Sequence, residues 1–184
     1  MKDTVFTGTP ATLAQLLASR EQRAAQQKNL LTIWRVPVVC VLCNLPGAVK
    51  NCPAGDILFL EATQALYALL EMHEISIVYD DAQNHVTGAE AFVCACAGAE
   101  TLKRICCEIE ETHPLGRLFD LDVIGLDGVP LSRTQLCFPK RRCLVCGGDA
   151  ASCVSRQLHP LSDVQAVILS MLKQYGTADF SEDV

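Results

Sequence analysis

The order of the apolar segments in the middle of the chain restricts its fold more than any other feature of the sequence. Extended and helical segments follow one another as strand, helix, strand, strand, helix, strand. They comprise residues 36–42, 56–72, 75–79, 91–96, 98–111 and 118–124. This order is typical of a split β-α-β core, in which helices pack on an antiparallel sheet. We therefore predict an α+β fold, an antiparallel sheet with packed helices and a ferredoxin-like core.

Outside this core, the sequence predicts a helix near each end of the chain. Thr9 resembles an N-cap, and the proline after it favours the first turn of a helix over 10–29. Its expected apolar face comprises Leu13, Leu17, Ala24 and Leu31. Near the C-terminus, Ser162 and Gln165 have the spacing of a capping box, and Gly176 is expected to end that helix.

Length and composition indicate the class of protein. With 184 residues, of which 50% are hydrophobic, the chain can bury a core, so we predict one domain over 1–184 with a mobile acidic tail over 177–184. No basic segment followed by an apolar run opens the sequence, and no apolar stretch reaches about 18 residues. We therefore expect a cytoplasmic location and no membrane insertion. The net charge of −6 argues against nonspecific nucleic-acid binding.

Two aspartates in the last strand of the core are the main candidates for chemistry. Asp120 and Asp122 are separated by one residue, so both side chains leave a strand on the same face. Such a pair can share one Mg²⁺ ion, which binds through one or two carboxylates together with substrate phosphates. Gly116 and Arg117 precede the pair and offer close backbone approach and bidentate phosphate contacts. A polar strand edge is the structural alternative.

A second group of residues has the composition of a zinc site. Cys143, Cys146, Cys153 and His159 fall within 142–160 and provide three thiolates and one imidazole. This is a closed tetrahedral ligand set, and the two-residue spacing of the first pair is usual for a zinc knuckle. Reduced cysteines at a surface turn, or a redox pair, are the alternatives.

Five basic residues could bind phosphate groups. Arg20 and Arg23 lie on the first helix, where their stems could equally cover the edge of the core. Lys50 follows the turn after the first strand, where an ordinary loop is the simpler explanation. Arg133 and Arg142 belong to a basic segment that suits a solvated face as well as an anion site.

One histidine could act as a proton acceptor. His113 stands before a proline and shortly before the aspartate pair. A histidine in this position can accept a proton from a substrate hydroxyl, but it can also cap the end of a helix.

Taken together, these residues resemble the apo-citrate lyase phosphoribosyl-dephospho-CoA transferase family over nearly the whole chain. The resemblance rests on Arg20-x-x-Arg23 with Gln26-Gln27, Asn44-x-Pro46-Gly47-x-x-Lys50, Thr87-Gly88, Glu110-Glu111-x-His113-Pro114-Leu115-Gly116-Arg117-Leu118-Phe119-Asp120-Leu121-Asp122-Val123, Ser132-Arg133, and Arg142-Cys143-Leu144-x-Cys146 through Cys153-x-x-Arg156-x-x-His159.

The resemblance implies a nucleotidyltransferase-type reaction and, as an alternative to a ferredoxin-like core, a nucleotidyltransferase-like one. Triphosphoribosyl-dephospho-CoA would donate its phosphoribosyl-dephospho-CoA part to a serine of the apo-acyl carrier subunit of citrate lyase, and pyrophosphate would leave. The aspartate pair would bind Mg²⁺, while Arg117, Arg133 and Lys50 would hold phosphates. His113 or Glu110 would accept the hydroxyl proton.

The sequence departs from the wider nucleotidyltransferase superfamily in one respect. That superfamily often has a Gly-Ser turn before its carboxylate pair and a third carboxylate on a neighbouring strand. Here Ser132 and Arg133 follow the hairpin signal without an acid, so Asp127 or Glu111 would have to be any third ligand.

Two rival functions remain open at this point. A phosphatase could use the Asp-x-Asp pair, although the sequence before the pair lacks the buried apolar strand that such enzymes need. A zinc-stabilised adaptor could bind the carrier protein through its basic segment without catalysis.

Overall fold

The computed structural model describes residues 4–176 and divides the chain into two compact units, Met1–Pro139 and Lys140–Val184. The expected mobile tail over 177–184 lies outside the described residues. The expectation of a single domain over 1–184 stays a prediction, and each unit is described by itself below.

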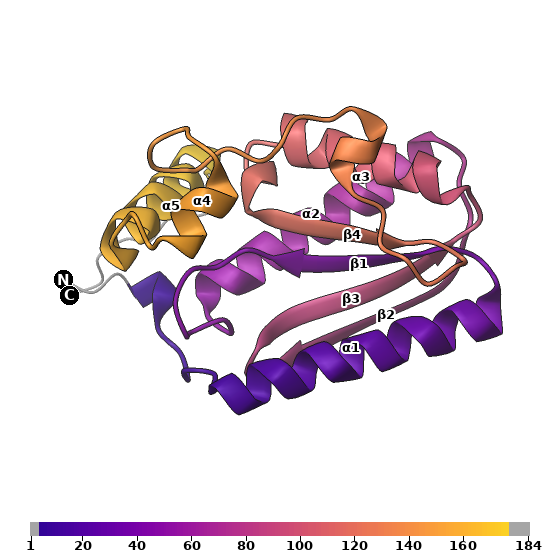
Figure 1. Cartoon of the computed structure of the whole chain (residues 1–184), viewed down its shortest axis with the longest axis horizontal. Helices are drawn as coiled ribbons and strands as arrows, with labels where there is room; N and C mark the ends of the chain where they lie inside the picture. The colour runs from indigo at the N-terminus through magenta and orange to yellow at the C-terminus, as the bar shows by residue number, and fades with distance from the viewer. Residues whose placement is uncertain (1–3, 177–184) are drawn as a thin grey trace. The chain divides into compact units, whose positions relative to one another are not determined.

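A four-stranded antiparallel sheet forms the centre of the first unit. Its strands are β1 (Val38–Cys43), β2 (Ile77–His85), β3 (Gly88–Ala95) and β4 (Phe119–Ile124), in the order β2-β3-β1-β4 (Figure 1). All three strand pairs are antiparallel. Helices α2 (Pro53–Met72) and α3 (Ala99–Thr112) connect β1 to β2 and β3 to β4. This topology confirms the predicted α+β fold with a split β-α-β core.

Helices pack on both faces of the sheet. On one face, α2 and α3 contact β1, β3 and β4. On the other face, α1 (Leu13–Trp34) contacts β1 and β3. Leu30 of α1 packs there with alternate residues of three strands, in a buried cluster of Leu30, Val38, Cys40, Phe92, Cys94 and Ile124. We call this side of the sheet the α1 face.

The buried side of α1 differs from the apolar face predicted for it. Leu13 is 73% exposed and Leu17 is 49% exposed, whereas Ser19 and Leu30 are buried. The helix also begins three residues later than expected, with Thr12 as its N-cap in a capping box with Gln15. The physical reason is that α1 turns the polar side chains of Ser19, Arg23 and Gln27 toward the sheet. There they form hydrogen bonds with Thr87, Glu90 and Cys40.

The remaining elements are short, apart from the last helix. Single 3-10 turns occur at η1 (Thr4–Phe6), η2 (Gly116–Leu118) and η3 (Arg133–Leu136). The second unit contains α4 (Ala150–Ser155) and α5 (Leu161–Tyr175). Gly176 ends α5 in the left-handed conformation, as predicted, but the helix begins after Pro160 without a side-chain cap. Within residues 4–176, no helix has both the length and the apolar character needed to cross a bilayer.

Candidate functional site

The side chains of β4 alternate between the two faces of the sheet. Phe119, Leu121 and Val123 are buried, whereas Asp120 and Asp122 between them are half-buried. The two carboxylates therefore leave the strand on the same side, and their Cα atoms are about 7 Å apart at the usual rise of an extended strand. This is the shared orientation that the spacing of the aspartates predicted.

The pairing of β4 with β1 places both aspartates on the α1 face. Asp122 lies opposite Cys40, and Asp120 lies opposite Leu42. Cys40 belongs to the cluster that packs under Leu30 of α1. Because paired residues of adjacent strands point to the same face, the carboxylates emerge on the α1 face rather than on the face that α2 and α3 cover.

A buried lysine approaches the aspartate pair around the edge of the sheet. The Nζ atom of Lys103, on α3, donates a hydrogen bond to the carbonyl of Leu121 at 2.7 Å. The same Nζ atom lies 3.8 Å from Oδ1 of Asp122. The side chain of Asp122 is 50% exposed, so its carboxylate is accessible to solvent as well as close to a cation.

An arginine of α1 and a buried glutamate of β3 form an ion pair on the same face. Nε of Arg23 donates to Oε2 of Glu90 at 2.7 Å, and the Glu90 side chain is only 8% exposed. Continuing the β1–β3 register by one residue from Val41 and Ala91 brings Glu90 beside Leu42. Glu90 thus lies in the same row as Asp120, with one strand between them.

Sequence reasoning missed Glu90 as a residue of this site. The available signal was a single carboxylate within the apolar strand Gly88–Ala95, at a position where the strand is otherwise buried. A buried carboxylate requires a charged or hydrogen-bonding partner. That partner, Arg23, is 67 residues away in the chain, so the strand alone could not reveal it.

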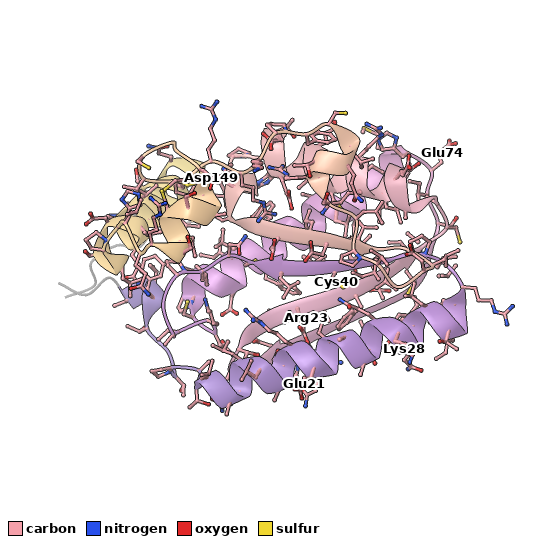
Figure 2. All side chains as sticks on the ribbon, viewed as in Figure 1. Glu21, Arg23, Lys28, Cys40, Glu74 and Asp149 are labelled. Atoms are coloured by element: carbon pink, nitrogen blue, oxygen red, sulfur yellow. The ribbon has the colours of Figure 1, made fainter. Side chains whose placement is uncertain are left out.

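The charges around Cys40 show how closely these groups gather. Burial raises the pKa of the Cys40 thiol to about 12. Asp122 and Glu90 also raise this pKa, while the hydrogen bond from Gln27 and the charge of Arg23 lower it. Figure 2 labels Arg23 beside α1 and Cys40 beside β1. The thiol is therefore surrounded by side chains of α1, β3 and β4.

Lys50 lies close to the start of β3. A Cβ atom added at Gly88 would be 3.4 Å from Cβ of Lys50. The two residues line a small cavity of about 30 Å³ together with Leu42 and Thr87. The Lys50 ammonium donates to the carbonyl of Leu45, and burial lowers the pKa of Lys50 below its usual value.

Most of the predicted phosphate-binding residues of the first unit gather at one end of the sheet. At this end β1 finishes while β3 and β4 begin. Thr87, just before β3, donates to the hydroxyl of Ser19 at 3.2 Å, which ties the first half of α1 to this end. The neighbouring Arg20 is exposed, and the half-buried Arg117 lies in the turn that leads into β4.

The structure does not bring His113 to the face that carries the aspartates. Its ring packs against Phe119, with centroids 4.9 Å apart, and its Nε2 atom is 3.9 Å from a carboxylate oxygen of Glu61 on α2. Phe119 alternates with Asp120 along β4, so His113 lies on the opposite side of the sheet. Burial lowers the pKa of His113 below its usual value.

Glu110 and Arg133 occupy a buried network at the outer edge of β4. Oε1 of Glu110 accepts the N–H of Leu121 at 3.0 Å, and Oε2 lies 3.3 Å from Nη2 of Arg133. The same Nη2 atom donates to Glu111 at 2.6 Å. These contacts close the free edge of the strand, which otherwise exposes backbone groups. The structure thus places both residues in a stabilising contact of the fold.

Gly116 has a packing reason for being glycine. A Cβ atom at this position would lie 2.7 Å from the carbonyl oxygen of Glu110 and would also clash with that of Ile109. The residue is buried against the end of α3. The absence of a side chain therefore allows the turn between α3 and β4 to pack closely against the backbone of α3.

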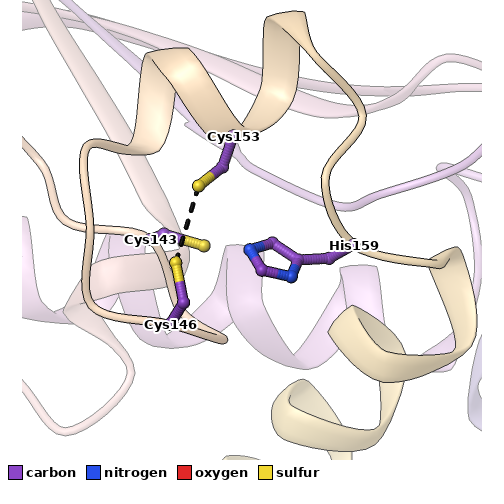
Figure 3. A group of neighbouring side chains, drawn as sticks. All are labelled: Cys143, Cys146, Cys153 and His159. Carbon is purple, nitrogen blue, oxygen red and sulfur yellow. Dashed lines mark hydrogen bonds between the residues drawn. The ribbon is translucent and has the colours of Figure 1, made fainter.

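The second unit brings together the four predicted zinc ligands. One ligand atom from each of Cys143, Cys146, Cys153 and His159 lies within 4.8 Å of the other three (Figure 3). Backbone N–H groups of Cys146 and Val145 at its sulfur lower the pKa of Cys143 to about 7, whereas burial raises the pKa of Cys153 to about 12.

Arg142 belongs to the same segment. It is exposed and forms an isolated β-bridge with Asp149 immediately beside the four cysteine and histidine residues.

Comparisons with known proteins agree on one family. The family profile described as apo-citrate lyase phosphoribosyl-dephospho-CoA transferase matches residues 11–175. The chain is 36% identical to a protein of that name from Escherichia coli O9:H4 over 152 residues, which is 83% of each chain. It is 38% identical to a probable member from Vibrio cholerae over 165 residues, covering 89% of this chain and 93% of that one.

A third relative is much longer than this chain. The protein named CitXG from Haemophilus influenzae is 34% identical over 177 residues. The match covers 96% of this chain but spans only 37% of the Haemophilus protein.

Proposed function

Because the chain belongs to the apo-citrate lyase phosphoribosyl-dephospho-CoA transferase family, we propose that it is an enzyme that transfers this group to apo-citrate lyase. The donor is triphosphoribosyl-dephospho-CoA, and the acceptor is a serine of the apo-acyl carrier subunit. Pyrophosphate is released. The enzyme acts in the cytoplasm without nucleic acid or membrane.

The observation that carries the proposal is the gathering of opposite charges at one end of the sheet. Asp120 and Asp122 share the α1 face with the Arg23–Glu90 pair. Lys50 and Arg117 flank the same end, where β1 finishes and β4 begins. A triphosphate requires both kinds of group, because cations hold its oxygens while carboxylates hold the metal that accompanies it.

The proposed reaction is a displacement at phosphorus. The serine oxygen of the carrier forms a bond to the α-phosphorus of the donor, and the bond from that phosphorus to the β-phosphate oxygen breaks. Its electron pair leaves with pyrophosphate, and the serine proton is released to solvent. The product is a phosphodiester between the carrier and the phosphoribosyl-dephospho-CoA arm. Such reactions depend mainly on positioning and on stabilisation of negative charge.

The donor set of the aspartate pair fits Mg²⁺. Asp120 and Asp122 offer carboxylate oxygens on one face, and at least the Asp122 side chain is accessible to solvent. When bound, Mg²⁺ supplies positive charge for the triphosphate and the leaving pyrophosphate. The ammonium of Lys103 balances part of the charge of Asp122 and holds it near the strand edge.

Cationic side chains around the pair orient the donor. Lys50 and Arg117 are half-buried, so little conformational freedom remains to be lost when they contact phosphate. Arg20 is exposed and can reach a phosphate or the nucleotide part of the donor from α1. Arg23 is held by its ion pair with Glu90, which fixes α1 against β3.

The decisive test is a loading assay with purified components. The full chain is incubated with triphosphoribosyl-dephospho-CoA, Mg²⁺ and apo-carrier, and the intact mass of the carrier is followed together with released pyrophosphate. We expect one phosphoribosyl-dephospho-CoA group per carrier and an equal amount of pyrophosphate. No carrier modification, or release of single phosphates from simple phosphoesters instead, would exclude the transferase in favour of the adaptor or the phosphatase.

A further inference from the structure

The Cys/His cluster of the second unit has the dimensions of a metal site without a disulfide. The Sγ atoms of Cys146 and Cys153 are 3.6 Å apart, which is far longer than the roughly 2.05 Å of a disulfide bond. Ligands bound to one tetrahedral zinc ion at about 2.3 Å are separated by roughly 3.8 Å. All four ligand atoms lie within 4.8 Å of one another, so a small contraction around an ion completes the tetrahedron.

The histidine of the cluster points at the three sulfur atoms. Figure 3 shows the imidazole of His159 facing the thiols of Cys143, Cys146 and Cys153. Its Nε2 atom is buried and has no hydrogen-bond partner among residues 4–176. A buried polar atom without a partner is costly, and a bond to a metal ion removes that cost. The orphaned nitrogen is a second observation, independent of the cysteine spacing, that indicates a ligand.

The backbone around the first two cysteines forms a knuckle. Gly147 donates to the carbonyl of Cys143 at 3.0 Å, and the N–H of Cys143 donates to Gly148 at 2.7 Å. Gly147 adopts a φ of +70°, a conformation that glycine enters without strain. The turn therefore holds both thiols on one side, where a single ion can reach them.

A short helix brings the third thiol to the same point. Asp149 caps α4 by accepting the N–H of Ser152 at 2.7 Å. Cys153 follows in this helix, and the N–H of Leu158 returns to its carbonyl at 3.0 Å. The chain then turns at Gln157, with a φ of +50°, and delivers His159 to the cluster. The knuckle, α4 and the turn at Gln157 thus bring the four ligands to one position.

The second unit has little else to stabilise it. Among its described residues, only Cys153, Ile168 and Leu172 are buried apolar side chains. Units of about 40 residues usually require a disulfide, a metal or a partner in order to fold. All the cysteines of this unit are free thiols. Because these thiols are not joined in disulfides, a metal ion bound by them is the kind of cross-link that can stabilise the unit.

We propose that Cys143, Cys146, Cys153 and His159 bind one Zn²⁺ ion, and that folding of residues 140–176 depends on it. Three thiolates and an imidazole match zinc rather than magnesium or calcium, which prefer oxygen ligands. Four protein ligands fill a tetrahedral site, so the ion has no position for substrate and its role is structural. This inference does not depend on the transferase reaction.

The first test measures metal in the unmodified full chain. Elemental analysis of protein purified without chelator is expected to give about one zinc per chain. X-ray absorption at the zinc edge should then show three sulfur ligands at about 2.3 Å and one nitrogen at about 2.0–2.1 Å. Cobalt exchanged into the site should give the intense visible bands of tetrahedral thiolate coordination. Protein without zinc that also fails to take up tetrahedral cobalt would overturn the proposal.

The second test compares cysteine variants. Cys146→Ser should lose the zinc and should expose residues 140–176 to protease and to rapid amide exchange. Cys137→Ser and Cys96→Ser are matched controls, because both thiols are exposed and lie outside the cluster. The controls should keep one zinc per chain. If Cys146→Ser kept its zinc and its protection from protease and amide exchange, the proposal would be contradicted. This holds whether or not the variant still loads the carrier.

Discussion

The ammonium of Lys103 on α3 lies 3.8 Å from a carboxylate oxygen of Asp122 on β4. Lys103 is almost fully buried and also donates to the carbonyl of Leu121. We expect Lys103→Met to lower the free energy of unfolding by about 1–3 kcal/mol, because that carbonyl loses its buried partner. We also expect loading to reach half its maximum at a several-fold lower Mg²⁺ concentration, because a competing cation is gone. Lys28→Met, at an exposed position of α1, is the control and should change neither the free energy of unfolding nor the Mg²⁺ concentration for half-maximal loading.

Replacing either aspartate of the pair tests the proposed metal site directly. Asp120→Asn and Asp122→Asn should each reduce carrier loading by at least about a hundredfold, since the loss of positioned charge stabilisation costs several kcal/mol. Both variants should still unfold cooperatively, because the side chains are half-buried rather than in the core. Asp81→Asn on β2 is the control and should load normally. Full carrier modification by the double variant, measured by intact mass, would remove the pair from the mechanism.

The order of the core elements was predictable because each strand and helix of the core carries its own local pattern. β1 is a continuous apolar run rich in valine, and α3 has apolar side chains at helical spacing. β2 was predicted too short, since Asp80, Gln83 and Asn84 are poor strand formers and are tolerated only at an edge of the sheet. Pairing with β3 overrides this local preference.

The composition of the site was less predictable than the fold. The spacing of Asp120 and Asp122 is local, so their shared face followed from strand geometry. The contact of Arg23 with Glu90 joins elements 67 residues apart, and no local pattern encodes it. The same limit explains why the buried face of α1 was predicted wrongly. Leu13 and Leu17 indicated one face, but the side chains that form hydrogen bonds with the sheet lie on another.

Glu110 offers a test that separates stability from catalysis. Glu110→Ala leaves the N–H of Leu121 and the guanidinium of Arg133 with fewer partners in a buried setting. The free energy of unfolding should fall by about 3–5 kcal/mol, as is typical when one member of a buried ion pair is removed. The milder Glu110→Gln should load the carrier within a few-fold of the unmodified rate per folded molecule. Glu108→Gln, which is exposed on the same helix, serves as the control.

A large loss of loading in a stably folded Glu110→Gln protein would instead identify Glu110 as the proton acceptor. Chemical denaturation and loading rates measured on the same samples distinguish the two outcomes.

A substitution at Gly116 tests whether close packing of the backbone requires glycine there. Gly116→Ala places a methyl group 2.7 Å from the carbonyl oxygen of Glu110, so the turn before β4 must shift. Overpacking of this kind typically lowers the free energy of unfolding by about 1–3 kcal/mol. Gly98→Ala is a suitable control, because its nearest contact would be 3.9 Å away. Thermal unfolding of both variants decides the matter, and equal stability would contradict the packing explanation.

His113 should make the stability of the fold depend on pH. Its Nδ1 atom accepts the N–H of Leu115 at 3.1 Å, and burial lowers its pKa below the ordinary value of about 6.5. Protonation would place a hydrogen on Nδ1 and break this bond. As the pH falls below about 6.5, the unfolded chain therefore binds a proton that the folded chain resists, and stability is lost.

The residue can be isolated from other titrating groups by comparing variants. His113→Asn keeps an acceptor for the N–H of Leu115 but cannot titrate, so its free energy of unfolding should fall less between pH 7.5 and pH 5.5. His73→Asn, at an exposed helix end, should retain the pH dependence of the unmodified chain. Urea unfolding at both pH values measures the difference. An unchanged pH dependence in His113→Asn would mean that protonation of this imidazole does not oppose folding, despite its burial against Phe119.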